Sequence, residues 1–425
     1  MNAKPEIIDQ GRRTFIKASA AVGGGLLIGF YLPGASRLAE ADQAQPAAFQ
    51  PNAWIRIGTD DVVTVVVDKS EMGQGVMTAL PMLVAEELEV ELARIRTEFA
   101  PAGAAYVNPL IGVQLTGGST SVRSSWEPLR KAGATARQML VAAAARTWGV
   151  KEDSCRAERG AVILAATGRR LSYGALADGA ATLPVPQKVS LKDPKDFKVI
   201  GKPAPRLDTP LKVNGQAGFG LDVQLPGMLT AVVVRCPVFG GKLAGFDTGT
   251  AMAVPGVRQV VPIDSGAAVV ATNFWAARQG AAALTVRWDE GTLAKLSSAG
   301  ISKTFARFAR TAGAVAKSRG DAANALKGAA HRLEAVYEVP YLAHATMEPM
   351  NCTAHVRPDG CDVWVPTQAQ GSAQQIAAKI AGLPPEAVRI HTTFLGGGFG
   401  RRAEQDFLAE AVQLSKATGA PVKVV

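Results

Sequence analysis

Cysteine is scarce in this sequence and is never clustered. The four cysteines among 425 residues lie far apart, and no C-x-x-C pair occurs. An iron–sulfur cluster needs grouped thiolates and zinc sites show similarly close spacing, so the sequence supports neither centre. Isolated cysteines act most simply as small core residues. A disulfide between Cys352 and Cys361 stays open, because spacing alone cannot establish a pair.

Aromatic residues and nucleotide-binding motifs are also sparse. Aromatic side chains make up 6% of the residues, and the basic residues behind the net charge of +10 are scattered. A nucleic-acid-binding face needs a basic stripe with stacking side chains, so this class is disfavoured. Neither G-x-x-x-x-G-K-[ST] nor G-x-G-x-x-G occurs, which argues against a nucleotide-dependent oxidoreductase. The length and the 48% hydrophobic content predict two to four domains with buried cores.

The N-terminus carries a targeting pattern. Arg12 and Arg13 are followed by Phe15 and Lys17, and then by an apolar, glycine-rich run over residues 18–32. This twin-arginine pattern predicts export to the periplasm of a protein that is already folded, as is typical of proteins that carry a cofactor. The run is short for a membrane span, and no clear cleavage site follows it. An uncleaved segment that anchors the protein to the membrane therefore stays open.

A glycine-rich turn near the C-terminus is the strongest chemical signal. Residues 388–394 have the composition of a strand, GGGFGRR follows over 396–402, and residues 403–414 favour a helix. Glycines at a strand-to-helix turn let a ligand approach bare backbone, and amides at a helix start attract anions. Arg401 and Arg402 suit a phosphate or an electron-rich group. On spacing alone, a plain turn with solvated arginines is the simpler interpretation.

The motifs around this turn resemble a known family. Three patterns follow one another, H-x-x-M-E-P, T-Q and G-G-G-F-G, at residues 344–349, 367–368 and 396–400. Together they resemble the molybdenum-cofactor-binding subunit of the xanthine dehydrogenase/aldehyde oxidase family, and the GRR ending resembles its periplasmic branch, typified by the isoquinoline 1-oxidoreductase beta subunit. The resemblance implies that Gln368 lies beside the molybdenum and that the amides of Phe399 and Gly400 lie near its oxo group. The other cofactor contacts implied in this turn are Gly397, Gly398 and Arg401.

An earlier glycine loop fits the same resemblance. Strand-like runs predict a β-hairpin over residues 54–67, and Glu71-Met-Gly-Gln-Gly75 then precedes a helix-like run over 76–88. An ordinary tight turn would also explain this pattern. The family has an E-x-G-Q-G loop in its second cofactor lobe, which implies that Gln74 and Gly75 contact the pterin or its phosphate.

A serine-rich turn precedes the next predicted helix, residues 126–148. Ser119, Thr120 and Ser121 lie within TGGSTSVRSS, whose hydroxyls, amides and arginine could cradle a phosphate. Helix N-capping explains the same residues equally well. The resemblance implies cofactor contact, because a serine-rich turn occupies this place in the family's cofactor lobe. That lobe comes before the GGGFG lobe here, which is the rearranged order of the isoquinoline-oxidoreductase branch.

The middle of the chain carries fewer chemical signals. Residues 201–295 are β-rich and resemble the family's hammerhead domain, and residues 314–333 favour a polar helix. His344 and Glu348 have a spacing that a metal pair could use, but no further ligand lies nearby, so we expect a buried hydrogen-bonded pair instead. The middle residues for which we expect structural roles are Arg206, Lys212 and Asp222.

These observations predict an α+β fold, in which two cofactor-binding lobes of mixed sheets and helices flank a hammerhead α/β domain. The expected segments are a signal with its linker, a lobe with the GQG loop, the hammerhead and a lobe with the GGGFG loop, over residues 1–45, 46–200, 201–295 and 296–425. The resemblance implies molybdenum with molybdopterin, in the cytosine dinucleotide form. It also implies the large subunit of a periplasmic hydroxylase that oxidises an aldehyde or an N-heterocyclic aromatic with water.

The resemblance also implies partners and a missing part. A small [2Fe-2S] subunit and an electron acceptor such as a cytochrome c would accompany this chain. Family members continue for several hundred residues past the equivalent of Val425, and their general-base glutamate lies there, so we expect a fragment that is inactive alone. Ala403 stands where some relatives carry a substrate-binding glutamate, so Glu404 receives no such role. An exported binding or scaffold protein on the same fold is the alternative.

Overall fold

The computed structural model of the chain describes residues 25–29 and 53–425. The twin-arginine pattern lies outside these residues, so export stays a prediction. Five residues of the apolar run form strand β1 (Gly25–Gly29), which pairs in antiparallel fashion with β2 (Ala53–Gly58). Within the described part of the chain, no helix combines the length and the apolar character that crossing a bilayer requires.

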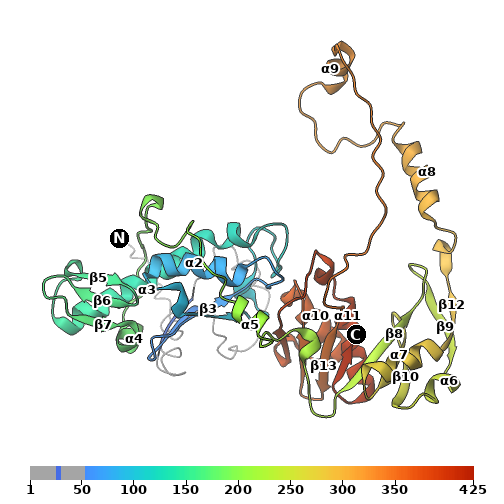
Figure 1. Cartoon of the computed structure of the whole chain (residues 1–425), viewed down its shortest axis with the longest axis horizontal. Helices are drawn as coiled ribbons and strands as arrows, with labels where there is room; N and C mark the ends of the chain where they lie inside the picture. The colour runs from blue at the N-terminus through green and yellow to red at the C-terminus, as the bar shows by residue number, and fades with distance from the viewer. Residues whose placement is uncertain (1–24, 30–52) are drawn as a thin grey trace, which may run out of the picture.

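The first lobe, which contains β3 in Figure 1, is built on a four-stranded sheet in the order β1-β2-β3-β4. The valine-rich β3 (Val63–Val67) pairs antiparallel with β2, as the predicted hairpin requires, and parallel with β4 (Ile95–Phe99). Helix α2 (Val76–Leu88) connects the two parallel strands. The loop between β3 and α2 therefore lies at the carboxyl end of a parallel strand, the usual place for ligands in such sheets.

Helix α3 (Ser121–Trp148) packs against α2. Gly133 makes this approach close, because a Cβ there would lie 2.8 Å from the Val84 carbonyl oxygen. The helices and the sheet enclose one apolar core, whose members include Ile55, Val65, Leu80, Val84, Leu129 and Leu140. A small antiparallel sheet and one helix complete the lobe, with bounds β5 (Cys155–Glu158), β6 (Ala161–Leu164), β7 (Arg170–Ser172) and α4 (Tyr173–Ala181). The chain then continues through α5 (Thr209–Val213).

A seven-stranded sheet forms the second lobe, in the order β10-β11-β8-β16-β13-β14-β15. Its strands are β8 (Leu229–Arg235), β10 (Val257–Ile263), β11 (Gly266–Ala271), β13 (Cys352–Arg357), β14 (Gly360–Val365), β15 (Val388–Thr392) and β16 (Val422–Val424). The β16–β8 and β14–β15 pairs are parallel and the others are antiparallel. The sheet thus continues across the boundary that the sequence predicts between residues 295 and 296.

Helices cover this sheet on both faces. Helices α10 (Gln370–Ala381) and α11 (Asp406–Thr418) share one core with it, while α7 (Phe274–Ala283) packs on β8 and β11. All six residues of β11 are buried, because alternate residues face two different cores. The short α6 (Gly249–Met252) and the pair β9 (Lys242–Asp247) and β12 (Thr285–Asp289) lie at the same end (Figure 1).

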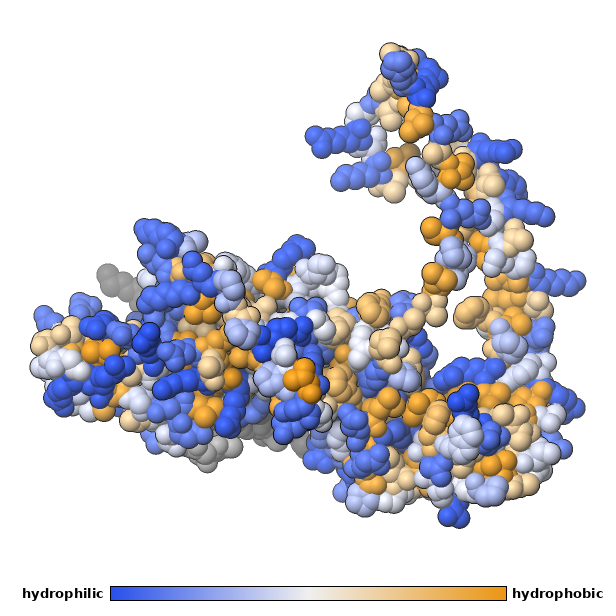
Figure 2. Space-filling view, in the orientation of Figure 1, coloured by the Kyte–Doolittle hydropathy of each residue, from blue (hydrophilic) through white to orange (hydrophobic). Residues whose placement is uncertain are grey.

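Residues 290–347 leave both lobes as a long excursion (Figure 1). It contains α8 (Ser298–Phe308) and α9 (Ala322–Gly328), and Figure 2 shows apolar residues exposed along it. The predicted helix over 314–333 is wrong outside α9. Asp321 caps α9 by accepting from the Asn324 amide, and Gly320 before it has a φ of 70°, which a helix does not allow.

The mixed helix-and-sheet class predicted from the sequence is confirmed. The four cysteines are free thiols. Cys361 lies opposite Val356 on the antiparallel β13–β14 pair, four residues along β13 from Cys352. At about 3.4 Å per residue, this separation exceeds what a disulfide can bridge.

Candidate functional site

A buried carboxylate organises the first glycine loop, residues 71–75. Glu71 is fully buried, and its Oε1 accepts from the amides of Gly73 at 2.9 Å and Gly75 at 3.0 Å. Its Oε2 accepts from the amide of Met77, in the first turn of α2, at 3.1 Å. Gly75 has a φ of 88°, which suits glycine and lets the loop turn into the helix. The loop is therefore held by its own glutamate.

The Gln74 side chain is exposed and spans its own loop. Its Oε1 accepts from the Met72 amide and its Nε2 donates to the Ser70 carbonyl, both at 2.8 Å. The structure thus places Gln74 at the surface of the loop, with its polar ends engaged inside the loop. The cofactor contact implied for Gln74 and Gly75 stays a prediction.

The second glycine loop, residues 396–400, presents free backbone donors. Gly397 and Phe399 have positive φ values of 94° and 53°, whereas Gly398 between them does not. Within the described structure, the amides of Gly397, Gly398 and Phe399 have no hydrogen-bond partner. Such alternation of left-handed and other residues forms an anion-binding nest. The Phe399 side chain is 69% exposed, and its left-handed backbone carries a cost of about 1–2 kcal/mol.

Gln368 joins this loop to the first lobe. Its Oε1 accepts from the Gly400 amide at 3.1 Å, and its Nε2 donates to the Thr116 carbonyl at 2.9 Å. The Thr116 amide donates back to the Gln368 carbonyl at 2.8 Å. A Cβ on Gly398 would lie 2.7 Å from Gln368 Oε1 and 2.5 Å from Met72 Sδ, so a larger residue there would displace these side chains. The two glycine loops and the Thr116 turn therefore meet at one point.

A buried polar network underlies this meeting point. The Ser70 hydroxyl donates to the Thr367 carbonyl at 2.7 Å and accepts from Gln370 Nε2 at 2.9 Å. The Ser70 amide donates to the Thr116 hydroxyl at 2.8 Å, and the Leu395 amide donates to the Glu71 carbonyl at 3.0 Å. Because buried polar groups are costly to leave unpaired, this network fixes the register between the lobes.

In the serine-rich turn, some hydroxyls are hydrogen-bonded within the protein and others are free. Thr120 is buried, accepts from Asn108 Nδ2 at 2.7 Å and donates to the Gly117 carbonyl at 2.8 Å. Across the described residues, the hydroxyls of Ser119 and Ser121 have no partner. Helix α3 begins at Ser121, five residues earlier than predicted, and the Thr120 side chain does not cap it. Ser119 and Ser121 thus remain available to a ligand.

The two arginines after the glycine loop have protein partners. Arg401 makes a forked ion pair with Asp406, at 2.8 and 2.6 Å. Arg402 is fully buried, and its Nε donates to the Gly397 carbonyl at 2.7 Å. The predicted helix start at residue 403 is wrong: a short 3₁₀ turn covers Arg401–Ala403, and α11 begins at Asp406. The amides nearest the glycines therefore belong to the loop itself.

The expected buried pair of His344 and Glu348 is also wrong. Glu348 is buried, but His344 is exposed. Glu348 instead accepts from the Gly396 amide at 2.9 Å and pairs with Arg402 at 3.2 Å. A spacing of four brings side chains together on a helix, and residues 341–346 have no regular secondary structure.

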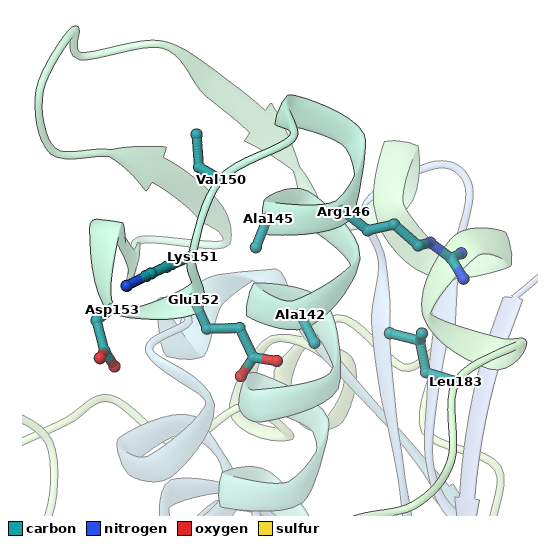
Figure 3. Close-up of a pocket in the computed structure, with 8 residues that line it drawn as sticks. All are labelled: Ala142, Ala145, Arg146, Val150, Lys151, Glu152, Asp153 and Leu183. Atoms are coloured by element: carbon teal, nitrogen blue, oxygen red, sulfur yellow. The ribbon is translucent and has the colours of Figure 1, made fainter.

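Two hollows lie away from this meeting point. One of about 500 Å³ separates the edges of β4 and β15 and is lined by Phe99, Ile390 and Phe394, among others. Another of about 530 Å³ lies at the end of α3 (Figure 3). There Arg146 and Asp153 point to opposite sides, so its charged groups do not converge. In the described part of the chain, no three His, Cys, Asp or Glu side chains gather as metal ligands.

Comparison with known proteins identifies the family of the chain. The sequence profile of the molybdopterin cofactor-binding domain matches twice, over residues 3–218 and 308–425. These two matches contain the GQG loop and the GGGFG loop respectively. The chain belongs to the xanthine dehydrogenase/aldehyde oxidase family of molybdopterin-binding proteins.

Curated relatives cover nearly the whole chain. The beta subunit of isoquinoline 1-oxidoreductase from Brevundimonas diminuta is 33% identical over 99% of this chain and 60% of its own length. A membrane-bound aldehyde dehydrogenase (pyrroloquinoline-quinone) of Gluconacetobacter polyoxogenes is 31% identical over 97% of this chain and 55% of its own length. A nicotinate dehydrogenase subunit of Pseudomonas putida is 31% identical over 87% of this chain and 31% of its own length. The chain thus spans 60% or less of the length of these relatives.

Solved structures of the family give weaker matches. Aldehyde oxidoreductase from Desulfovibrio desulfuricans aligns with a TM-score of 0.43 and 20% identity, over 59% of this chain and 33% of that one. Quinoline 2-oxidoreductase from Pseudomonas putida 86 aligns with a TM-score of 0.40 and 19% identity, over 52% of this chain and 33% of that one.

The free groups of the second glycine loop and of the serine-rich turn that follows Thr116 fit molybdopterin. An oxo-bearing, phosphorylated cofactor needs hydrogen-bond donors and close backbone approach. The amides of Gly397, Gly398 and Phe399 and the hydroxyls of Ser119 and Ser121 supply donors, and Gly400, with no atom within 4 Å of its Cβ position, supplies the approach. The Gly400 amide is occupied by Gln368, so in this structure the Phe399 amide is the free member of the implied pair.

Several residues that shape the site carry no distinct sequence signal. Thr116 and Met72 contact Gln368 and Gly398 from the first lobe, and nothing in their local spacing predicts it. Arg206 reaches Glu71 at 3.0 Å from a linker more than 130 residues away in sequence. For Glu71, one signal was present: a carboxylate directly before two glycines and a helix start can accept their amides.

Proposed function

We propose that this chain forms most of the cofactor-binding part of the large subunit of a periplasmic molybdenum hydroxylase. The enzyme would oxidise an aldehyde or an N-heterocyclic aromatic, with water as the source of oxygen. The observation that carries this proposal is the convergence of both glycine loops at Gln368 and Gly398, with three free amides beside them.

The chain's residues would bind, orient and shield the cofactor. The amides of the second glycine loop would donate to its oxo end, Ser119 and Ser121 to its phosphates, and Gln74 to the pterin. Molybdopterin would supply the metal centre that accepts electrons from the substrate, and its cytosine dinucleotide form is our choice for a bacterial enzyme. Donors of fixed direction stabilise charge without reorganisation, which is the main contribution a protein makes here.

The substrate class and partners follow from the names of the relatives. Isoquinoline, nicotinate and aldehyde appear in those names at 31–33% identity. Two relatives are named as subunits, so we propose a small [2Fe-2S] subunit and a cytochrome c-type acceptor for this chain as well. The general-base glutamate would come from sequence beyond Val425.

Cofactor analysis of the full-length protein, purified from the periplasm of its host with its partners, tests the proposal. We expect one molybdenum per large subunit and release of a cytosine nucleotide on acid hydrolysis. Turnover of benzaldehyde, isoquinoline and nicotinate with an artificial electron acceptor would then assign the substrate class. A folded protein that lacks both molybdenum and pterin would overturn the enzyme function and favour a scaffold. Pyrroloquinoline quinone in place of molybdenum would overturn the proposed molybdenum cofactor.

A further inference from the structure

A buried ion pair lies directly behind the second glycine loop. The Arg402 side chain is 0% exposed and the Glu348 side chain 6% exposed, and Nη2 lies 3.2 Å from Oε2. Arg402 Nη2 also donates to the Glu348 carbonyl at 2.6 Å. Burial lowers the pKa of Arg402, against the opposing effect of Glu348. Burying a guanidinium this deeply costs desolvation free energy unless its hydrogen bonds compensate, so the groups that it contacts matter.

The pair grips the loop at two successive residues. Glu348 Oε2 accepts from the Gly396 amide at 2.9 Å, and Arg402 Nε donates to the Gly397 carbonyl at 2.7 Å. Glu348 Oε1 is itself held by the Leu221 amide at 3.3 Å and by Asn351 Nδ2 at 2.9 Å. Both loop contacts draw polar backbone groups inward, toward the ion pair.

The contact with Gly397 sets the direction of the next amide. In a trans peptide the C=O and N–H groups point in opposite directions, and no cis peptide occurs among the described residues. Because Arg402 draws the Gly397 carbonyl inward, the Gly398 N–H must point outward. A Cβ at Gly398 would meet Met72 Sδ and Gln368 Oε1, so this residue lies where the two lobes meet.

We propose that Arg402 is a positioning residue of the cofactor site, which acts through Gly397 to aim the Gly398 amide at the bound group. Glu348 supports this role by neutralising the charge of Arg402 and by accepting a hydrogen bond from the Gly396 amide. This inference rests on the proposed function, because it takes the bound group to be the molybdenum cofactor. Arg402 does not touch that group, since its side chain is fully buried behind the loop.

Cofactor retention tests the proposal separately from activity. The variant Arg402→Lys keeps the charge but loses the rigid guanidinium fork that fixes the directions of the contacts with Gly397 and Glu348. In full-length protein with its partners, we expect Arg402→Lys to keep folded secondary structure and to lose molybdenum and pterin about tenfold faster on gel filtration, as expected for loss of one directed contact. We also expect a changed spectroscopic signature of the remaining molybdenum.

A control is Arg235→Lys. Arg235 is 49% exposed and pairs with the buried Glu410 through Nε, at 2.8 Å, and Nη2, but it contacts neither glycine loop. This variant should retain cofactor at the wild-type rate. Equal retention and an unchanged molybdenum spectrum in Arg402→Lys would overturn the inference.

A double variant keeps the test decisive if Arg402→Lys fails to fold. Glu348→Gln with Arg402→Met removes both charges together, which buried sites commonly tolerate, and still offers Gly396 an acceptor. It should fold and lose cofactor about tenfold faster than wild type; retention at the wild-type rate would overturn the inference. Wild-type protein that contains no molybdenum or pterin would instead overturn the proposed function. The inference about Arg402 fails only when the wild type contains the cofactor and the variants keep it equally well.

Discussion

The two glycine loops are built on the same plan but leave different groups free. Each is held by a buried glutamate that accepts loop amides, Glu71 in the first and Glu348 in the second. In the first loop, Glu71 and Gln74 occupy the amides of Met72, Gly73 and Gly75. In the second, three consecutive amides have no partner in the described structure. The second loop is therefore the better anion site, while the first offers mainly a side chain.

The arginines that support the two glutamates differ in burial. Arg206 comes from the linker, is 37% exposed and also contacts Asp208 and the Gly73 carbonyl. Arg402 belongs to the end of its own loop, is 0% exposed, and its Nη1 has no partner. The first loop is thus held through Glu71 by a partly exposed arginine, and Lys212, 3.7 Å from Glu71, is a second cation that supports the same carboxylate. Behind the second loop lies the buried pair of Arg402 and Glu348, and Gln368 holds the Gly400 amide at its other end.

The largest effect should come from breaking that buried pair. We expect Glu348→Ala to lower the free energy of unfolding by about 3–5 kcal/mol, because it strands the Arg402 charge in the interior. Urea unfolding of the full-length protein measures this. The Glu348→Gln/Arg402→Met variant, which removes both charges, should recover most of the loss. If the double variant were as unstable as the single one, charge burial would not be the cause.

A smaller effect should follow from filling the space at Gly398. A Cβ there would lie 2.5 Å from Met72 Sδ and 2.7 Å from Gln368 Oε1, so the Met72 and Gln368 side chains must move and the contacts of Gln368 between the loops are disturbed. We expect Gly398→Ala to cost about 1–3 kcal/mol in urea unfolding and to release cofactor. Gly218→Ala is the control, because no atom lies within 4 Å of its Cβ position. Wild-type stability and cofactor content in Gly398→Ala would show that the loops meet elsewhere.

The exposed clamp on the first loop should matter less. Arg206→Ala should cost about 1 kcal/mol, because the pair is partly solvated and Lys212 remains near Glu71. The comparison variant is Arg56→Ala, whose pair with Glu98 is about half exposed and should contribute still less. The same unfolding assay ranks the three variants. A loss for Arg206→Ala as large as that for Glu348→Ala would erase the proposed difference between the loops.

Local signals in the sequence predict individual strands and helices, but they do not predict that the two glycine loops meet at Gln368. The valine run of β3 and the helix over 76–88 follow from short-range periodicity, and both form as predicted. The glycine loops were recognisable because a strand, glycines and a helix follow one another directly. Their meeting at Gln368 depends on Thr116, which lies 252 residues away, and no local pattern encodes such a contact.

The errors have physical causes of the same kind. The start of α11 was predicted three residues early, because Arg401–Ala403 forms a 3₁₀ turn whose residues also suit a helix. His344 and Glu348 were predicted to pair from a spacing that is informative only on a helix. The sequence suggested that Arg402 suits a phosphate or is solvated, but Arg402 is buried and its Nε donates to a carbonyl of its own loop. Burial of charge depends on tertiary packing, which a motif does not specify.

The smallest expected effect is the pH dependence of stability that comes from Asp208, the carboxylate that contacts both Arg206 and Lys212. Burial opposes its ionisation, but hydrogen bonds from Arg206 and Lys212 prevail and lower the pKa of Asp208 to about 2. A carboxylate with a depressed pKa stabilises the folded protein above its ordinary pKa, and this stabilisation disappears as pH falls through the folded value. Asp208→Asn should therefore unfold at a lower temperature than wild type at pH 7, and the gap should shrink between about pH 4 and pH 2. Thermal unfolding of both proteins across this range measures the gap. A gap that stays constant down to pH 2 would mean that Asp208 acts through packing and not through its charge on the clamp.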